Sequence, residues 1–94
     1  MSTLLVTMSI DPHRLEEARR HLREDVLGWA SSQPGFLRGH WYANEDNTRG
    51  YGVVDFDTAQ AAHAAADGPR GYTREASRAW NVESVDVLND IVQA

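Results

Sequence analysis

Histidine and acidic residues in one segment are spaced in a way that could serve metal binding. His13, Glu17 and His21 follow one another at intervals of four, which places all three on the same face of a helix. Five apolar residues share the other side of that helix: Leu15, Ala18, Leu22, Val26 and Trp29. We therefore expect the trio to face solvent without partners to orient it, and we predict no bound metal.

Arg38 and His40 form a second candidate group. They alternate with Gly39 and Trp41 in an extended segment, so both lie on one face of a strand. A histidine beside a carboxylate such as Asp55 is a candidate for acid–base catalysis. The plainer interpretation is a histidine in an interface and a surface ion pair between Arg38 and Asp55. Both residues stay candidates for catalysis.

The composition excludes several kinds of chemistry. Among 94 residues there are fourteen acidic and nine basic side chains, a net charge of −5, with no cysteine and no lysine. Disulfides, iron–sulfur clusters, thiol catalysis, Schiff bases and Walker-type phosphate binding are thereby excluded. Without a basic patch we expect no nucleic-acid or membrane partner. With no membrane span or signal peptide, we expect one cytoplasmic domain, residues 1–94.

The first third of the chain predicts a strand and then a helix. Residues Thr3 to Ile10 alternate between apolar and polar side chains, which is typical of a strand with one buried face. Asp11 then caps a helix that has Pro12 at its first position, and the apolar spacing continues to Trp29. The segment from Ser31 to Gly35 ends this helix.

A hairpin is predicted from residues 36–42 and 51–56, because the polar segment from Asn44 to Arg49 separates them. One register sets large side chains against glycine and opposite charges against each other, as cross-strand pairing favours. It pairs Ala43 with Gly50, Trp41 with Gly52, Gly39 with Val54, Leu37 with Phe56, Tyr42 with Tyr51, and Arg38 with Asp55.

An alanine-rich helix is predicted from Ala59 to about Ala66. Asp57 or Thr58 caps its N-terminus, and Gln60 is placed for a capping box with Asp57. The glycines and the proline of residues 68–71 end the helix.

The remaining segments complete a β-α-β-β-α-β order. Residues Tyr72 to Trp80 predict a short further helix, and Val82 to Val92 the last strand. This order predicts a ferredoxin-like α+β fold, a four-stranded antiparallel sheet with the helices on one face. The opposite face would carry Val53, Phe36 and the tyrosines, which is too apolar for water alone. We therefore expect a homodimer that packs sheet against sheet.

Two short segments carry a family resemblance: Gln33-Pro34-Gly35-Phe36-Leu37, and Val53-Val54-Asp55-Phe56-Asp57-Thr58 before the alanine-rich helix. Together with the layout of nearly the whole chain, they resemble the antibiotic-biosynthesis-monooxygenase-like (ABM) family. The resemblance implies a dimeric α+β barrel. On this scaffold some members oxygenate polycyclic phenols without a cofactor, and others degrade haem, so the fold alone does not give the function.

The haem-degrading branch of that family is poorly matched. It requires an asparagine on the first strand, a tryptophan at the end of the third and a histidine after the second helix. The first strand here has no asparagine, Phe56 stands at the tryptophan position, and Ser77 is the nearest match to the histidine. Because iron would lack its axial imidazole, we predict no haem, and no other cofactor.

The cofactor-free branch implies an apolar pocket between helices and sheet that holds and deprotonates a phenol. Four aromatic residues would line it: Trp41, Phe56, Tyr72 and Trp80. Arg38 or His40 would stabilise the anion, although aromatic residues on strands are also ordinary core residues. Two functions stay open. One is a cofactor-independent monooxygenase-like enzyme acting on a small aromatic or polyketide-type substrate. The other is a non-catalytic dimeric domain that binds a small ligand or scaffolds a partner.

Overall fold

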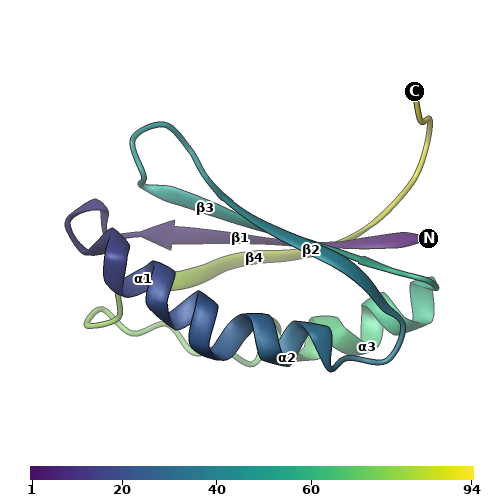
Figure 1. Cartoon of the computed structure of the whole chain (residues 1–94), viewed down its shortest axis with the longest axis horizontal. Coiled ribbons are helices and arrows are strands. Elements are labelled where there is room, and N and C mark those ends of the chain that lie inside the picture. Colours follow the sequence, from purple (N-terminus) through teal and green to yellow (C-terminus); the bar gives the residue numbers. More distant parts are fainter.

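The computed structural model describes residues 1–94 as a four-stranded antiparallel sheet with helices on one face (Figure 1). The strands are β1 (Ser2–Ile10), β2 (Phe36–Ala43), β3 (Arg49–Phe56) and β4 (Trp80–Asn89), in the spatial order β2-β3-β1-β4. Every neighbouring pair is antiparallel. The ferredoxin-like α+β fold is therefore confirmed.

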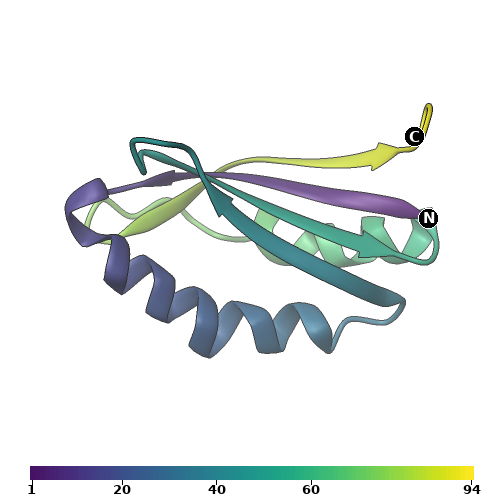
Figure 2. The same ribbon diagram turned by 45° about the horizontal axis from the view of Figure 1, so that its top comes forward.

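The first helical segment is one continuous rod that lies below the sheet (Figure 2). It consists of a 3₁₀ turn η1 (Pro12–Arg14), α1 (Leu15–His21), a π-helical turn η2 (Leu22–Val26) and α2 (Leu27–Ser31). The carboxylate of Asp11 caps it by accepting the N–H of His13 at 3.0 Å, as predicted. The π turn was not predicted, and such turns are frequent at functional sites.

The second helix, α3 (Ala59–Arg70), is longer than predicted: it continues through Gly68 and Pro69, which were expected to end it. Its cap is Thr58, whose hydroxyl accepts the N–H of Ala61 at 3.1 Å. The predicted capping box with Asp57 is wrong, because the main-chain N–H of Asp57 donates to Gly35 instead. None of the helices is both long and apolar enough to cross a membrane.

No helix forms between α3 and β4, contrary to prediction. The side chain of Asn81 accepts the main-chain N–H of Glu75 and donates to its carbonyl, both at 2.9 Å. These two bonds hold the segment in a turn, and Arg14 anchors it further through the carbonyl of Ser77. The strand β4 also begins and ends earlier than predicted, and Ile91 beyond it is 98% exposed.

The hairpin register is confirmed from Ala43 opposite Gly50 as far as Arg38 opposite Asp55. It is wrong at Leu37, because a bulge there places Phe36 opposite Phe56. Phe36 therefore lies on the helix face of the sheet and not on the outer face. Its ring packs edge-on against that of Phe56, with ring centres 6.5 Å apart.

The core is divided between the two helical segments. Beneath α3, Leu4 and Phe56 are fully buried against Ala62 and Ala66. Beneath α1, a second cluster consists of Met8, Ala18, Ala79 and Trp80. The small alanine side chains bring α3 close to the sheet, whereas larger side chains separate the other rod from it. That difference positions the site described next.

Candidate functional site

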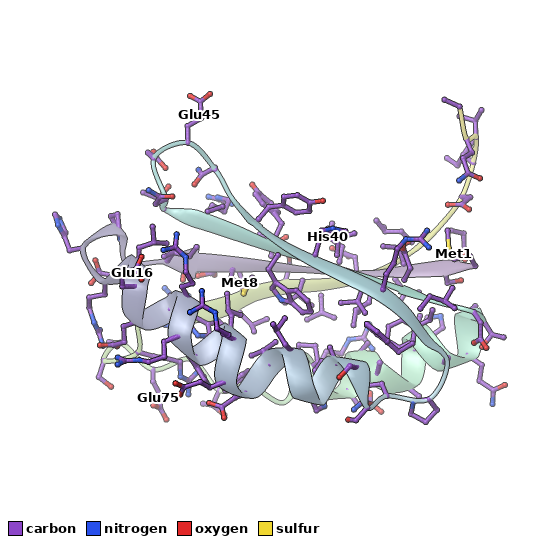
Figure 3. All side chains as sticks on the ribbon, in the orientation of Figure 1. Met1, Met8, Glu16, His40, Glu45 and Glu75 are labelled. Atoms are coloured by element: carbon purple, nitrogen blue, oxygen red, sulfur yellow. The ribbon has the colours of Figure 1, made fainter.

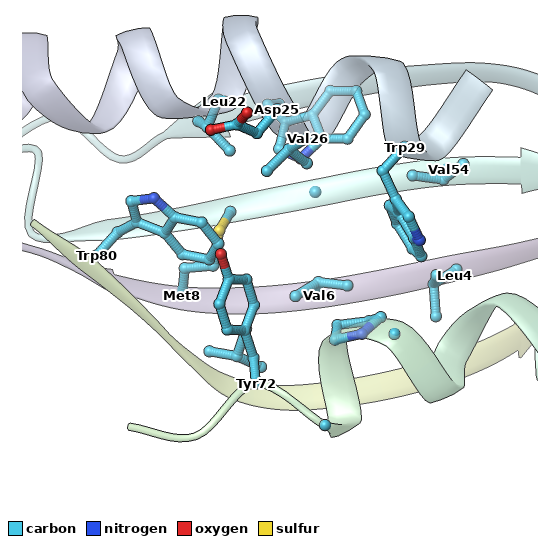
Figure 4. Close-up of a pocket in the computed structure, with 16 residues that line it drawn as sticks. Leu4, Val6, Met8, Leu22, Asp25, Val26, Trp29, Val54, Tyr72 and Trp80 are labelled. Atoms are coloured by element: carbon cyan, nitrogen blue, oxygen red, sulfur yellow. The ribbon is translucent and has the colours of Figure 1, made fainter. Parts of the chain in front are cut away.

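A cavity of about 370 Å³ lies between the sheet and the helices (Figure 4). Leu4, Val6 and Met8 of β1 contribute to one wall, and η2 and α2 contribute Leu22, Val26 and Trp29 to another. Eleven of its sixteen lining residues are hydrophobic. The volume falls within the range of small-molecule sites, about 300–1,000 Å³.

Glycines make room for the tryptophans that frame this cavity. A methyl group added at Gly68 of α3 would lie 2.5 Å from the ring of Trp29, and one at Gly52 of β3 would lie 2.8 Å from Nε1 of Trp41. Both distances are shorter than any normal contact, so each ring rests directly on glycine. These close approaches place Trp29 and Trp41 at the cavity wall.

Three of the four aromatic residues predicted for the pocket line this cavity: Trp41, Tyr72 and Trp80. Tyr72 and Trp80 stand together at one end (Figure 4), edge to face with ring centres 5.1 Å apart. Phe56 is placed elsewhere, fully buried in the core beneath α3. Trp29 was not among the predicted lining residues, although its place in the apolar stripe of the first helix indicated an inward side chain.

The two candidates Arg38 and His40 are not brought to this cavity. Alternation along β2 turns both toward the sheet face away from the helices, as the view of all side chains shows for His40 (Figure 3). Arg38 pairs with Asp55 at 2.9 Å, as predicted, and the ring of His40 stacks on that of Tyr42. Neither side chain is placed to act on a molecule inside the cavity.

His21 occupies a place that the sequence did not predict. Trp80 donates its indole N–H to Nδ1 of His21 at 2.9 Å. On the other side of the ring, Nε2 lies 3.3 Å from Oδ2 of Asp25 and 3.4 Å from Oη of Tyr72. The expectation that His21 faces solvent is therefore wrong, because the segment before β4 covers that side of the helix. No spacing in the sequence connects residue 21 with residues 72 and 80.

Asp25 and Tyr72 extend this group of polar side chains to the cavity, because both belong to its lining. Asp25 lies within η2, and its side chain is 69% exposed at the cavity edge. The arrangement sets a carboxylate, an imidazole and a phenol at one end of an otherwise largely apolar space. A ligand with an apolar ring and a polar end would match this distribution.

The metal trio considered from the sequence does not assemble. Glu17 pairs with Arg14, and His21 is engaged by Trp80, so His13 is left alone on the exposed surface. No group of three or more histidine, cysteine, aspartate or glutamate side chains is arranged to hold a metal ion.

The residues present also do not fit haem. No histidine lines the cavity, and both ring nitrogens of His21 lie within hydrogen-bonding distance of other side chains. Ser77, at the position nearest to the expected histidine, is exposed, and its carbonyl accepts a hydrogen bond from Arg14. A haem iron in this cavity would have no axial ligand from the chain.

The sheet order and the two helical segments on one face define a ferredoxin-like α+β fold. No protein-family model and no curated protein sequence matches the chain. The fold is shared with several solved structures at low sequence identity.

One such structure is the heme-degrader MhuD from Mycobacterium tuberculosis with two hemes in its active site. It has a TM-score of 0.68 and 14% identity, covering 100% of this chain and 99% of that one. HapK from Hahella chejuensis has a TM-score of 0.69 and 11% identity, covering 100% and 96%. The Streptomyces coelicolor monooxygenase from the gene ActVA-Orf6, in complex with Nanaomycin D, has a TM-score of 0.64 and 16% identity, covering 99% and 92%.

Proposed function

We propose that the cavity binds a small planar aromatic molecule and that the protein is a cofactor-independent monooxygenase acting on it. The observation that carries this proposal is the cavity itself, about 370 Å³, with three tryptophans and a tyrosine in its lining. Its polar side chains gather at one end, where Asp25 and Tyr72 contribute to the lining. The Streptomyces monooxygenase with bound Nanaomycin D shares the fold, which supports the proposal of a monooxygenase-like ligand site.

The chemistry that suits such a site needs little from the protein beyond binding. In an anthrone-type phenol, a ring CH₂ group is oxidised by O₂: one oxygen atom becomes the new carbonyl and the other leaves as water with the two hydrogens. No external reductant is required. The chain would hold the ring away from water and place hydrogen-bonding groups at the substrate oxygen that becomes negatively charged.

Asp25 and Tyr72 suit this task in different ways. The carboxylate of Asp25 accepts the hydrogen bond of a ligand hydroxyl, and its exposure lets a proton pass on to water. The phenol of Tyr72 can donate to an oxygen that carries negative charge. Arg38 and His40 play no part in this proposal, because neither lies in the cavity lining.

The test is oxygen uptake with a reduced anthrone-type phenol, compared between the wild type and Trp41→Ala. Trp41 lines the cavity, so its loss should lower turnover as well as the free energy of unfolding. Leu27→Ala is the matched control, since Leu27 is 42% exposed and lies outside this cavity. No oxygen uptake by the wild type across a panel of phenols would refute the monooxygenase.

A non-catalytic ligand-binding or scaffold domain is the second candidate. The close packing of α3 favours it, because Ala62, Ala65 and Ala66 are almost entirely buried and the turns that carry them lie directly on the sheet. A protein of this kind would bind the same aromatic probes without consuming oxygen. Calorimetric binding of an anthrone-type phenol without oxygen uptake would favour this second function.

We also propose that the protein forms a homodimer through the sheet face away from the helices. Tyr42 is 55% exposed on that face, and Tyr51 and Val53 of β3 are half-buried there. Ile91 and Val92, beyond β4, are 98% and 88% exposed and would gain from contact with a second copy. Light scattering at micromolar concentration should give twice 10.5 kDa, and a monomer mass would refute the dimer.

A further inference from the structure

The hydrogen bond from Trp80 sets the protonation pattern of His21. An indole N–H only donates, so Nδ1 of His21, 2.9 Å away, must present a lone pair. The neutral imidazole therefore carries its single proton on Nε2. A histidine in this state cannot serve as a base at either nitrogen without breaking a contact, and it acts instead as a hydrogen-bond donor.

The Nε2–H of His21 faces two oxygen atoms, Oδ2 of Asp25 at 3.3 Å and Oη of Tyr72 at 3.4 Å. Because His21 donates this proton, Oη of Tyr72 acts as the acceptor in the contact between them. The hydroxyl proton of Tyr72 is therefore free to form a different hydrogen bond. That hydroxyl makes no other hydrogen bond with the protein. Because Tyr72 lines the cavity, the direction left for its proton is toward a bound molecule.

The ring of Tyr72 is also fixed in place. It packs edge to face with Trp80 at 5.1 Å, and the guanidinium of Arg78 lies 4.5 Å from its ring centre. Arg78 is held in turn by hydrogen bonds to the carbonyl of Thr73 and to Asn81. A donor fixed in this way before the ligand arrives needs little reordering on binding.

We infer that Tyr72 is the specificity-determining donor to an oxygen of the bound ligand, and that His21 is the positioning residue that holds Tyr72 in this state through the tautomer set by Trp80. The inference rests on the proposed function of the cavity as an aromatic-ligand site. The preferred ligand is then an aromatic molecule with an accepting oxygen, a phenolate or a ring carbonyl, and not an unsubstituted ring.

The surrounding charges are compatible with a phenolate at this position. Asp25 is the one acidic residue in the cavity lining, and water screens its largely exposed carboxylate. Arg78 beside Tyr72 supplies a positive charge on the other side and is itself paired with Glu75 at 3.4 Å. The remaining charged groups around His21 are mixed in sign and line a hollow outside the cavity: Glu17, Arg20 and Glu24.

Calorimetry with two probes tests the inference, 4-nitro-1-naphtholate and 1-nitronaphthalene, which differ in the accepting oxygen. Tyr72→Phe should bind the naphtholate about tenfold more weakly than the wild type, because it loses one hydrogen bond to a charged acceptor, while its affinity for nitronaphthalene stays unchanged.

The positioning role is tested at His21 and Trp80. Trp80→Phe and His21→Leu should weaken naphtholate binding several-fold. His21→Gln keeps an N–H near the position of Nε2 and should restore part of the affinity. His63→Leu removes an exposed imidazole outside the cavity as the matched control.

A second readout needs no variant. In the wild-type protein, imidazole ¹⁵N NMR of the neutral form of His21 should show its proton on Nε2, and the opposite tautomer would overturn the inference. Equal naphtholate affinity in the wild type and Tyr72→Phe would also overturn it, while leaving the cavity as a ligand site. Failure of the wild type to bind either probe would instead refute the proposed function on which the inference rests.

Discussion

Replacing Gly52 by alanine should test how the cavity wall is built. Gly52 lies beneath the ring of Trp41, and a methyl group there would come within 2.8 Å of Nε1 and 3.2 Å of Cδ1. The far edge of the same ring rests on Gly39, where a methyl group would lie 2.9 Å from it, so the indole lies flat against the sheet at both glycines. Trp41 must therefore lift away from the strand.

The expected size of this effect follows from two opposing contributions. Crowding a packed side chain costs about 1–3 kcal/mol, and replacing glycine by alanine within a strand returns about 0.5–1 kcal/mol. The free energy of unfolding of Gly52→Ala should fall by about 1–2 kcal/mol. For a domain of this size, the melting temperature then falls by about 4–16 °C. Naphtholate affinity should fall with it, because the lifted ring of Trp41 enters the space of the ligand.

Urea unfolding followed by circular dichroism measures the change without depending on tryptophan fluorescence. Gly28→Ala is the matched control, because nothing lies within 4 Å of a methyl group at that position in α2. There the substitution should raise the free energy of unfolding by about 0.5–1 kcal/mol. If Gly52→Ala were stabilised in the same way, the contact between Trp41 and the glycine could not be as tight as described.

Three further perturbations have expected outcomes. Phe56→Ala, at a fully buried position, should lower the free energy of unfolding by about 3–5 kcal/mol in urea titrations and leave probe binding by the folded protein intact. The side-chain hydrogen bond from Thr48 holds the pKa of Asp46 below its ordinary value. This bond stabilises the folded protein at pH values above the ordinary pKa of an aspartate, and the contribution is lost as the pH falls through the lowered pKa of Asp46. Thr48→Val removes the bond and should raise the pKa of Asp46 in an NMR titration. Arg38→Ala breaks a partly exposed pair with Asp55 and should change the free energy of unfolding by less than about 1 kcal/mol in urea titrations.

Local patterns in the sequence were enough for most of the fold. Asp11 and Pro12 begin the first helix where the structure has it, and the pairing of Trp41 with Gly52 is found in the hairpin. These features depend on neighbours in sequence or on one adjacent strand, where alternation and cross-strand size rules apply directly. The bulge at Leu37 broke the alternation, and nothing in the residue types around it signals an extra residue.

The site was less predictable because it depends on contacts between distant segments. Trp80 and Tyr72 were expected to line a pocket and do so, since large aromatic residues near a helix–sheet interface seldom point to water. The helical spacing of the first helix predicts that His21 faces solvent, because that spacing contains no information about other segments that pack against the helix. The partial burial of His21 comes from the segment before β4, which Asn81 and Arg78 hold through hydrogen bonds that no periodicity reveals.

The division of the core explains why a cavity and its polar end are found together. Alanines at 62, 65 and 66 let the middle of α3 close on the sheet, whereas its last turn, with Gly68 and Pro69, lines the cavity. The other rod meets the sheet through larger side chains, and within it the π turn η2 carries Asp25 at the cavity edge. The polar side chains at that end come from the two irregular pieces of backbone, η2 and the turn before β4, and from their neighbours His21 and Trp80. These irregular segments therefore supply the polar end of a cavity whose apolar walls come from the sheet and the regular helices.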